Sequence, residues 1–428
     1  MAARLGSGWP FVLGATAWSG AAGQIHAGVH APYDYAFTGQ PDAARQAFVA
    51  LRAELQAAGD QFMAAIVQSN ELIWVALPFA ADDLVERRRV ATATDDVLRL
   101  ASGVYDEVPS LWLKLPLLVL EGEWSTARRV AEMAVAIRGG AQHVALPILA
   151  VLARDQGDPD VARALLRQVL PEGPATPPGT TFFAATLVFQ RLATSLALDV
   201  ADLVTARAWL ETHDRWLAWS GATLGQAEGQ LAWASYYRSA DQRARAEQRA
   251  RRSFALASDP RQPLALLAAH RLLGELATDA GRLDEASTRL EMGLALADAC
   301  AAPYERALTL LAQAELAFAG GRRRAALDLL EGVRATCSML GAAPMLARVA
   351  DLAARGAPAS RLGKAHPAGL TGREIEVIRL IAVGLSNTEI GARLCLSLPT
   401  VKNHVAHVLA KPTAAIGPPR RLSRCAKA

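Results

Sequence analysis

The sequence predicts an all-α protein: an α-solenoid of helix-pair repeats with a period near 40 residues, followed by a small helix-turn-helix domain. Three observations predict this fold. Residues 39–354 are rich in Ala, Leu, Arg and Glu, with Gly or Pro between the periodic stretches. A turn with Gly, and often Asp, recurs before helices that carry Ala near their start. Two short capped helices and a third with a polar face come near the C-terminus.

The composition excludes several classes of protein. At 428 residues, 52% hydrophobic and 20% charged, the chain can bury a large core and has too little charge for disorder. Its four cysteines show no CxxC spacing, which indicates neither a zinc site nor a disulfide framework. We therefore expect no metal or cofactor and a reducing, cytoplasmic location.

Five segments follow from shifts in composition and charge. Residues 361–428 contain 11 Lys and Arg against 3 Asp and Glu, a net charge of +8, whereas the whole chain carries +4. Polyanion binding is therefore expected of the C-terminal part. The predicted segments are a poorly ordered leader (1–38), the repeat domain (39–354), a linker rich in Gly, Pro and Ser (355–369), the helix-turn-helix domain (370–411) and an irregular basic tail (412–428).

The repeats are marked by one alanine in the first turn of a helix. One copy shows the amphipathic pattern, because Leu283, Ala286 and Leu290 form a single apolar stripe. The period and pattern resemble tetratricopeptide-like repeats, in particular the MalT-like type, which implies a concave surface for an effector or partner. The marking alanines are Ala44, Ala127, Ala162 and then Ala206, Ala246, Ala286 and Ala326, the last four spaced by 40 residues.

The densest group of aromatic residues lies within the repeats. It allows two interpretations: a stacking platform for an effector such as a sugar, or packing between helices, which the helical spacing favours. The candidate effector-binding residues are Trp209, Trp216, Trp219, Trp233, Tyr236 and Tyr237.

The first two helices of the C-terminal domain have clear capping signals. Thr371 and Glu374 form a capping box, and Gly384 ends the helix that follows. Ser386 and Glu389 form a second box, which starts a short helix. The predicted buried residues are Ile375, Ile378, Ile381 and Ala382 on the first helix, and Ile390 and Leu394 on the second.

A third helix is predicted to begin after the cap Ser397, and its two faces differ. Val401, Val405 and Val408 are spaced to face the core. Lys402 and Asn403 then fall on the outer face, together with Ala406, His407 and Ala410.

This stretch resembles the LuxR-type (NarL/FixJ-like) DNA-binding domain, because residues 370–405 fit LTxREIEVIxLIAxGLSNxEIxxxLxxSxxTVKxHV. The resemblance implies that the third helix enters the DNA major groove. Lys402 suits guanine or a phosphate, and Asn403 suits adenine. Thr400 and Arg393 suit phosphates. The alternative for each of these residues is a solvated surface side chain with no role in DNA binding. The candidate DNA-binding residues are Arg393, Ser397, Thr400, Lys402, Asn403, His404, Ala406 and His407.

The family pattern ends after Lys411. The family continues with a fourth helix used in dimerisation, whereas this tail contains Pro412, Pro418 and Pro419 and no apolar stripe. Dimerisation through that helix is therefore in doubt.

Together these features predict a transcription regulator. The chain has no GxxxxGK[ST], HExxH, GxSxG or Rossmann motif, so we expect no enzyme, and the upstream ATPase domain of many such regulators is lacking. The expected partners are double-stranded DNA, a small-molecule or protein effector on the repeats, and RNA polymerase; no membrane is expected. The alternative function is a repeat-based protein-interaction scaffold with an impaired DNA-binding domain.

Overall fold

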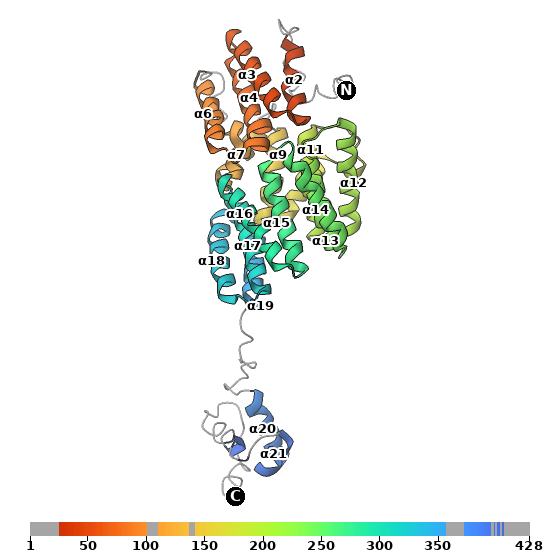
Figure 1. Ribbon diagram of the computed structural model, residues 1–428, viewed down its shortest axis with the longest axis vertical. Helices are drawn as coiled ribbons and strands as arrows, with labels where there is room; N and C mark the ends of the chain where they lie inside the picture. Colours follow the sequence, from red (N-terminus) through yellow and green to blue (C-terminus); the bar gives the residue numbers. More distant parts are fainter. Residues whose placement is uncertain are drawn as a thin grey trace. The chain divides into compact units, whose positions relative to one another are not determined.

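The computed structural model describes residues 25–100, 110–136, 142–356, 372–394, 398, 400–402 and 405. The chain divides into two compact bodies, a repeat body (residues 1–354) and a C-terminal body (residues 355–428). Helices make up both bodies, and the described residues include no strand. Both parts of the predicted fold, the helix-pair array and the small helical domain after it, are confirmed (Figure 1).

The repeat body consists of helices joined by short turns, in which consecutive helices pack in antiparallel pairs. The α-helices are α2 (Ile25–Phe37), α3 (Pro41–Ala57), α4 (Gln61–Glu71), α5 (Leu77–Ala80), α6 (Leu84–Leu100), α7 (Leu115–Leu120), α8 (Trp124–Ala136), α9 (Gln142–Gln156), α10 (Pro159–Val169), α11 (Phe183–Leu198), α12 (Leu203–Ser220), α13 (Gln226–Ser239), α14 (Arg243–Ser258), α15 (Pro263–Asp279), α16 (Leu283–Ala299), α17 (Pro303–Ala319), α18 (Arg323–Leu340) and α19 (Ala343–Gly356). Three short segments of other helix types are η2 (Leu72–Ala76), η3 (Ser110–Lys114) and η4 (Gly173–Ala175).

The ordered helices begin within the predicted leader. Helix α2 covers residues that the sequence assigned to a poorly ordered segment, and residues 1–24 lie outside the described part of the chain. Tyr33 and Phe37 of α2 are buried, and the ring of Tyr33 meets that of Phe48 edge-on at 5.3 Å between centroids. The leader prediction was therefore wrong for this helix, because its aromatic side chains complete the first core cluster.

The marking alanines explain how the helices pair. All seven are 0% exposed, so each lets a neighbouring helix approach closely, as predicted. The residue five positions before each alanine has a left-handed backbone, with φ between +54° and +100°. Five of these residues are glycines, but Ala201 and Asp241 take this conformation at the two copies that look weakest in the sequence. The turn is thus repeated even where its glycine is not.

The array curls back on itself, so that later helices touch earlier ones. Thr223 Oγ1 donates a hydrogen bond to the Thr38 carbonyl at 3.3 Å, across 185 residues of sequence. Gln156 Nε2 donates to the Leu340 carbonyl at 3.0 Å, across 184 residues. The ion pair between Arg261 and Asp82 spans 179 residues. Such contacts, between segments about 180 or more residues apart in sequence, indicate that successive turns of the superhelix hold the repeat body together.

One helical stretch of the described chain is long and apolar enough to cross a membrane. It runs over Gln61–Ala80, through α4, η2 and α5. Of its most apolar window, 61% is buried inside the repeat body. The stretch is therefore packed in the way of a core helix.

The C-terminal body contains two complete described helices, α20 (Gly372–Ala382) and α21 (Asn387–Leu394). Residues 398, 400–402 and 405, which belong to the predicted third helix, are also helical. Three of the residues that the sequence singled out for nucleic-acid binding, Arg393, Thr400 and Lys402, lie in these segments.

Candidate nucleic-acid interface

A glycine turn separates α20 from α21. Gly384 has φ of +92°, and its N–H donates to the Ile381 carbonyl at 2.9 Å. The Leu385 N–H donates to the Leu380 carbonyl at 3.1 Å. These two bonds form a Schellman motif, and Leu380 and Leu385 both pack on the core as the motif favours. The predicted end of this helix is confirmed.

A capping box starts α21. The N–H of Ser386 donates to Glu389 Oε2 at 2.8 Å, and the Ser386 hydroxyl donates to the same oxygen at 2.7 Å. The N–H of Glu389 returns a longer bond of 3.4 Å to Ser386 Oγ. These bonds lower the pKa of the Glu389 carboxyl. The second predicted box is confirmed, while Thr371 of the first lies outside the described residues.

Three apolar residues form the centre of this small core. Val377, Ile390 and Val401 are each 0% exposed, and Leu394 and Val405 pack against them. The predicted inward faces of the second and third helices are therefore correct at these positions, whereas Val408 lies outside the described residues.

The predicted face of α20 was partly wrong. Ile375, Ile378 and Ile381 are only half-buried, and Ala382 is exposed. The helix turns Val377 inward instead, because that residue lies opposite Ile390 and Val401. Several apolar residues follow one another in α20, so periodicity alone did not fix which of them would be central.

The candidate DNA-binding residues that the structure describes lie at or near the surface. Lys402 and Arg393 are exposed, and Thr400 is half-buried. Lys402 directly follows the buried Val401, so the third helix has one side in the core and a cation on the outside. The other candidates, Ser397, Asn403, His404, Ala406 and His407, lie outside the described residues.

The family of this segment is decided by comparison. Residues 368–414 match the bacterial regulatory proteins of the luxR family. This segment is a LuxR-family domain. A 42-residue stretch is 48% identical to the transcriptional regulatory protein LiaR of Bacillus subtilis, covering 10% of this chain and 20% of that protein.

A solved structure resembles a larger part of the chain. It is a STAND protein (signal transduction ATPase with numerous domains) with a tetratricopeptide repeat sensor, from Pyrococcus horikoshii. The TM-score is 0.42 at 9% sequence identity, and the match covers 85% of this chain and 52% of the other. The matched part of this chain thus spans about a fifth of the length of LiaR and about half of the length of the STAND protein.

The aromatic candidates in the repeats are mainly packing residues. Trp209, Trp216 and Trp233 are buried, and the face of Trp233 is covered by the Arg249 guanidinium at 5.4 Å from the ring centroid. Tyr236 and Tyr237 are half-buried beside Trp233, while Trp219 is 39% exposed at the edge of Trp216. The structure does not gather the six rings around one cavity, and their burial favours the packing interpretation.

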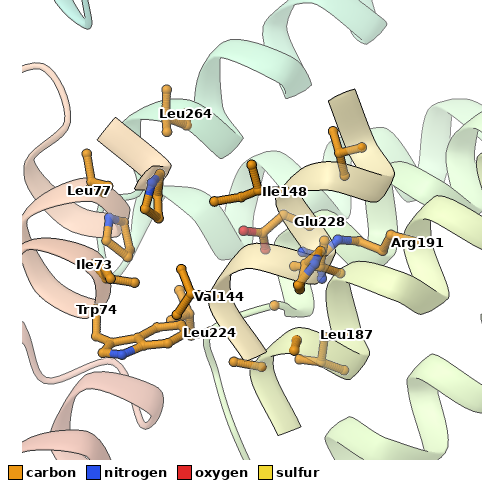
Figure 2. A pocket seen from close by; sticks show the side chains of 18 of the residues that line it. Ile73, Trp74, Leu77, Val144, Ile148, Leu187, Arg191, Leu224, Glu228 and Leu264 are labelled. Atoms are coloured by element: carbon orange, nitrogen blue, oxygen red, sulfur yellow. The ribbon is translucent and has the colours of Figure 1, made fainter. Parts of the chain in front are cut away.

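The structure reveals a cavity in the repeat body that the sequence analysis missed. Its volume is about 380 Å³, within the roughly 300–1,000 Å³ that small-molecule sites occupy. Helices far apart in the sequence supply its apolar walls, from Trp74 and Leu77 to Ile148, Leu187 and Leu264 (Figure 2). No sequence pattern could have located it, because the curl of the array brings these segments together.

Two charged residues, Arg191 of α11 and Glu228 of α13, line the same cavity (Figure 2). Behind Arg191, its Nη1 lies 3.2 Å from Nε2 of the buried His213. Because a guanidinium can only donate, His213 must accept and therefore be neutral. Burial, and then the charge of Arg191, lower the pKa of His213 to about 3.

This neutral histidine predicts loss of stability in acid. Unfolded His213 takes up a proton below its ordinary pKa of 6.5, while the folded form resists until about pH 3. The contribution of neutral His213 to the free energy of unfolding is therefore complete above pH 6.5 and declines as the pH falls from 6.5 toward 3. We expect His213→Gln to reduce the fall in unfolding free energy between pH 7 and pH 5 by up to ~1.4 kcal/mol per pH unit. Urea unfolding at both pH values measures it; an equal fall in both proteins would contradict the prediction.

Proposed function

We propose that this protein is a DNA-binding transcription regulator, in which the LuxR-family domain reads the major groove and the repeat body responds to an effector. The observation that carries the proposal is the pair Val401 and Lys402. Within a segment that matches the luxR family, one residue is fully buried and the next is exposed and basic. That is the arrangement a recognition helix requires.

The charge of the chain supports the same conclusion. The net +8 of residues 361–428 is concentrated in and around the LuxR-family domain, opposite in sign to the remainder. Such a charge attracts the phosphate backbone and releases counterions on binding. DNA would thus be drawn to this body and not to the repeats.

The roles of the remaining parts follow from this proposal. The repeat body would bind an effector, whose occupancy alters DNA binding or contacts with RNA polymerase. The protein would act in the compartment that holds DNA, without catalysing a reaction. LiaR, the relative of the domain, is a transcriptional regulatory protein by name, which fits this role.

A binding experiment separates the roles of Lys402 and Asn403. A preferred duplex is first selected from a random pool with the full-length protein, and affinities are then measured by fluorescence anisotropy at several salt concentrations. Asn403→Ala is expected to cost about 1–3 kcal/mol on the preferred duplex and little on a scrambled one. If Lys402 contacts a phosphate, Lys402→Ala should weaken both similarly and reduce the salt slope by about 1.

Arg163→Ala provides the control, since it removes one positive charge from an exposed ion pair of the repeat body. It should leave both affinities unchanged. Unchanged affinity and preference in both domain variants would contradict the site assignment. A full-length protein that binds no duplex even at low salt would favour the interaction-scaffold alternative.

A further inference from the structure

The cavity of the repeat body has polar residues among its apolar walls, as a ligand site does. Most of its lining is aliphatic or aromatic, but Arg191, Glu228 and Gln262 also line it. Burying charged and amide groups in an apolar cavity costs free energy unless they are hydrogen-bonded or paired. Their hydrogen bonds therefore show what the cavity is suited to hold.

Arg191 has spare hydrogen-bonding capacity. Its hydrogen-bond partner is the neutral His213, and among the described residues no carboxylate lies within ion-pair distance of its guanidinium. Burial lowers the pKa of Arg191, and the charge of Glu228 counteracts this through space. The two charges thus balance at a distance, without direct contact.

Two acceptors that line the same cavity as Arg191 lack donors. Glu228 Oε2 is buried and has no hydrogen-bond partner in the described structure. Gln262 is 2% exposed, and its Nε2 points at the carbonyls of Leu256 and Pro260, at 3.3 and 3.5 Å. Only an amide nitrogen would face two carbonyls, which fixes the orientation of this side chain. Its Oε1 is then a second acceptor without a donor.

These groups define the chemistry of an occupant. The acceptors need a donor, the guanidinium can still donate, and the walls need an apolar body. A hydroxyl both donates and accepts, so it can satisfy a carboxylate and a guanidinium together. A charged group would upset the balance between Arg191 and Glu228 in an apolar cavity.

We propose that this cavity binds an uncharged, largely apolar small molecule through a hydroxyl group placed between Arg191 and Glu228. That such a molecule is the effector of the regulator rests on the proposed function. The binding itself does not, because every contact comes from the repeat body.

Three naphthalenes of similar size test the chemistry on the full-length protein by equilibrium dialysis near pH 7. 2-Naphthol carries the neutral hydroxyl, naphthalene lacks a polar group, and 2-naphthoate carries a negative charge. We expect 2-naphthol to bind at least about tenfold more tightly than either of the others, the size of effect that one well-placed hydrogen bond gives. Equal binding of 2-naphthol and naphthalene, tighter binding of 2-naphthoate, or no binding by any of the three would each overturn the proposal.

Variants assign the effect to the cavity. Glu228→Gln keeps the shape but removes the charge that balances Arg191, so it should weaken 2-naphthol and strengthen 2-naphthoate. Glu211→Gln is the matched control on the exposed surface, where Glu211 pairs with Arg207, and should change neither. Ala185→Trp fills the cavity and should abolish binding of 2-naphthol. A preference for 2-naphthol that survives Glu228→Gln unchanged would contradict the assignment.

The two proposals fail separately. Dialysis contains no DNA, so absence of naphthol binding would leave the duplex-binding result intact. Loss of duplex binding would likewise leave the cavity result intact. A shift of duplex affinity on adding 2-naphthol would connect the two.

Discussion

Arg87→Ala is expected to lower the free energy of unfolding of the repeat body by about 3–5 kcal/mol. The side chain of Arg87 is 2% exposed and holds three segments at once. Its Nη1 donates to the carbonyls of Ala81 and Cys300 at 2.8 and 2.6 Å, and its Nη2 to Glu121 Oε1 at 2.9 Å. Alanine would leave both buried carbonyls without this donor and create a cavity.

Urea unfolding followed by tryptophan fluorescence measures this change. Arg163→Ala is again the control, because Arg163 and Asp160 form an exposed pair at 2.8 Å whose loss should cost no more than ~1 kcal/mol. Arg87→Lys should recover only part of the loss, since a single ammonium cannot match the fork of a guanidinium. An effect of Arg87→Ala as small as that of the control would show that the cross-turn contact contributes little.

Gly274→Ala should destabilise the protein by about 1–3 kcal/mol. A Cβ at Gly274 in α15 would lie 2.6 and 2.7 Å from Cγ and Cδ2 of Leu290. Leu290 is 0% exposed and belongs to the apolar stripe of α16, so it has little room to move. The glycine is therefore needed for close approach of the two helices, and not for a turn.

Gly332→Ala is the matched substitution, for which we expect the opposite change in stability. Gly332 lies within α18, and nothing comes within 4 Å of the Cβ that alanine would add. Alanine should stabilise the helix there by about 0.5–1 kcal/mol. Thermal or urea unfolding of both variants should show one loss and one gain; two changes of the same sign would contradict the packing argument.

The repeat architecture could be predicted from the sequence because its signals are local. The small residue in the first turn of each helix is visible at Ala206, Ala246, Ala286 and Ala326, and all four are buried. The first of these repeats is weak in the sequence because Ala201 replaces the expected glycine at the turn. Packing imposes the left-handed backbone there, which a propensity argument could not foresee.

The contacts between turns, and hence the cavity, could not be predicted from local sequence patterns. Arg87 appears in the sequence as one more charge on an amphipathic helix. No neighbouring residue indicates that it donates a hydrogen bond to the carbonyl of Cys300. Gln262 and Glu228 likewise look like ordinary surface residues. In the LuxR-family domain, by contrast, caps and core valines follow from neighbouring residues, and there the sequence failed mainly in choosing Val377 among adjacent apolar residues.

The contacts between turns of the repeat body have an evolutionary consequence. An open solenoid tolerates gain or loss of a whole repeat, because each repeat touches only its neighbours. Here an inserted or deleted helix pair between Thr38 and Thr223 would put each half of the coil out of register with the other. Duplication of single repeats, the usual way in which such arrays change length, is therefore disfavoured inside this coil and remains open only toward its ends.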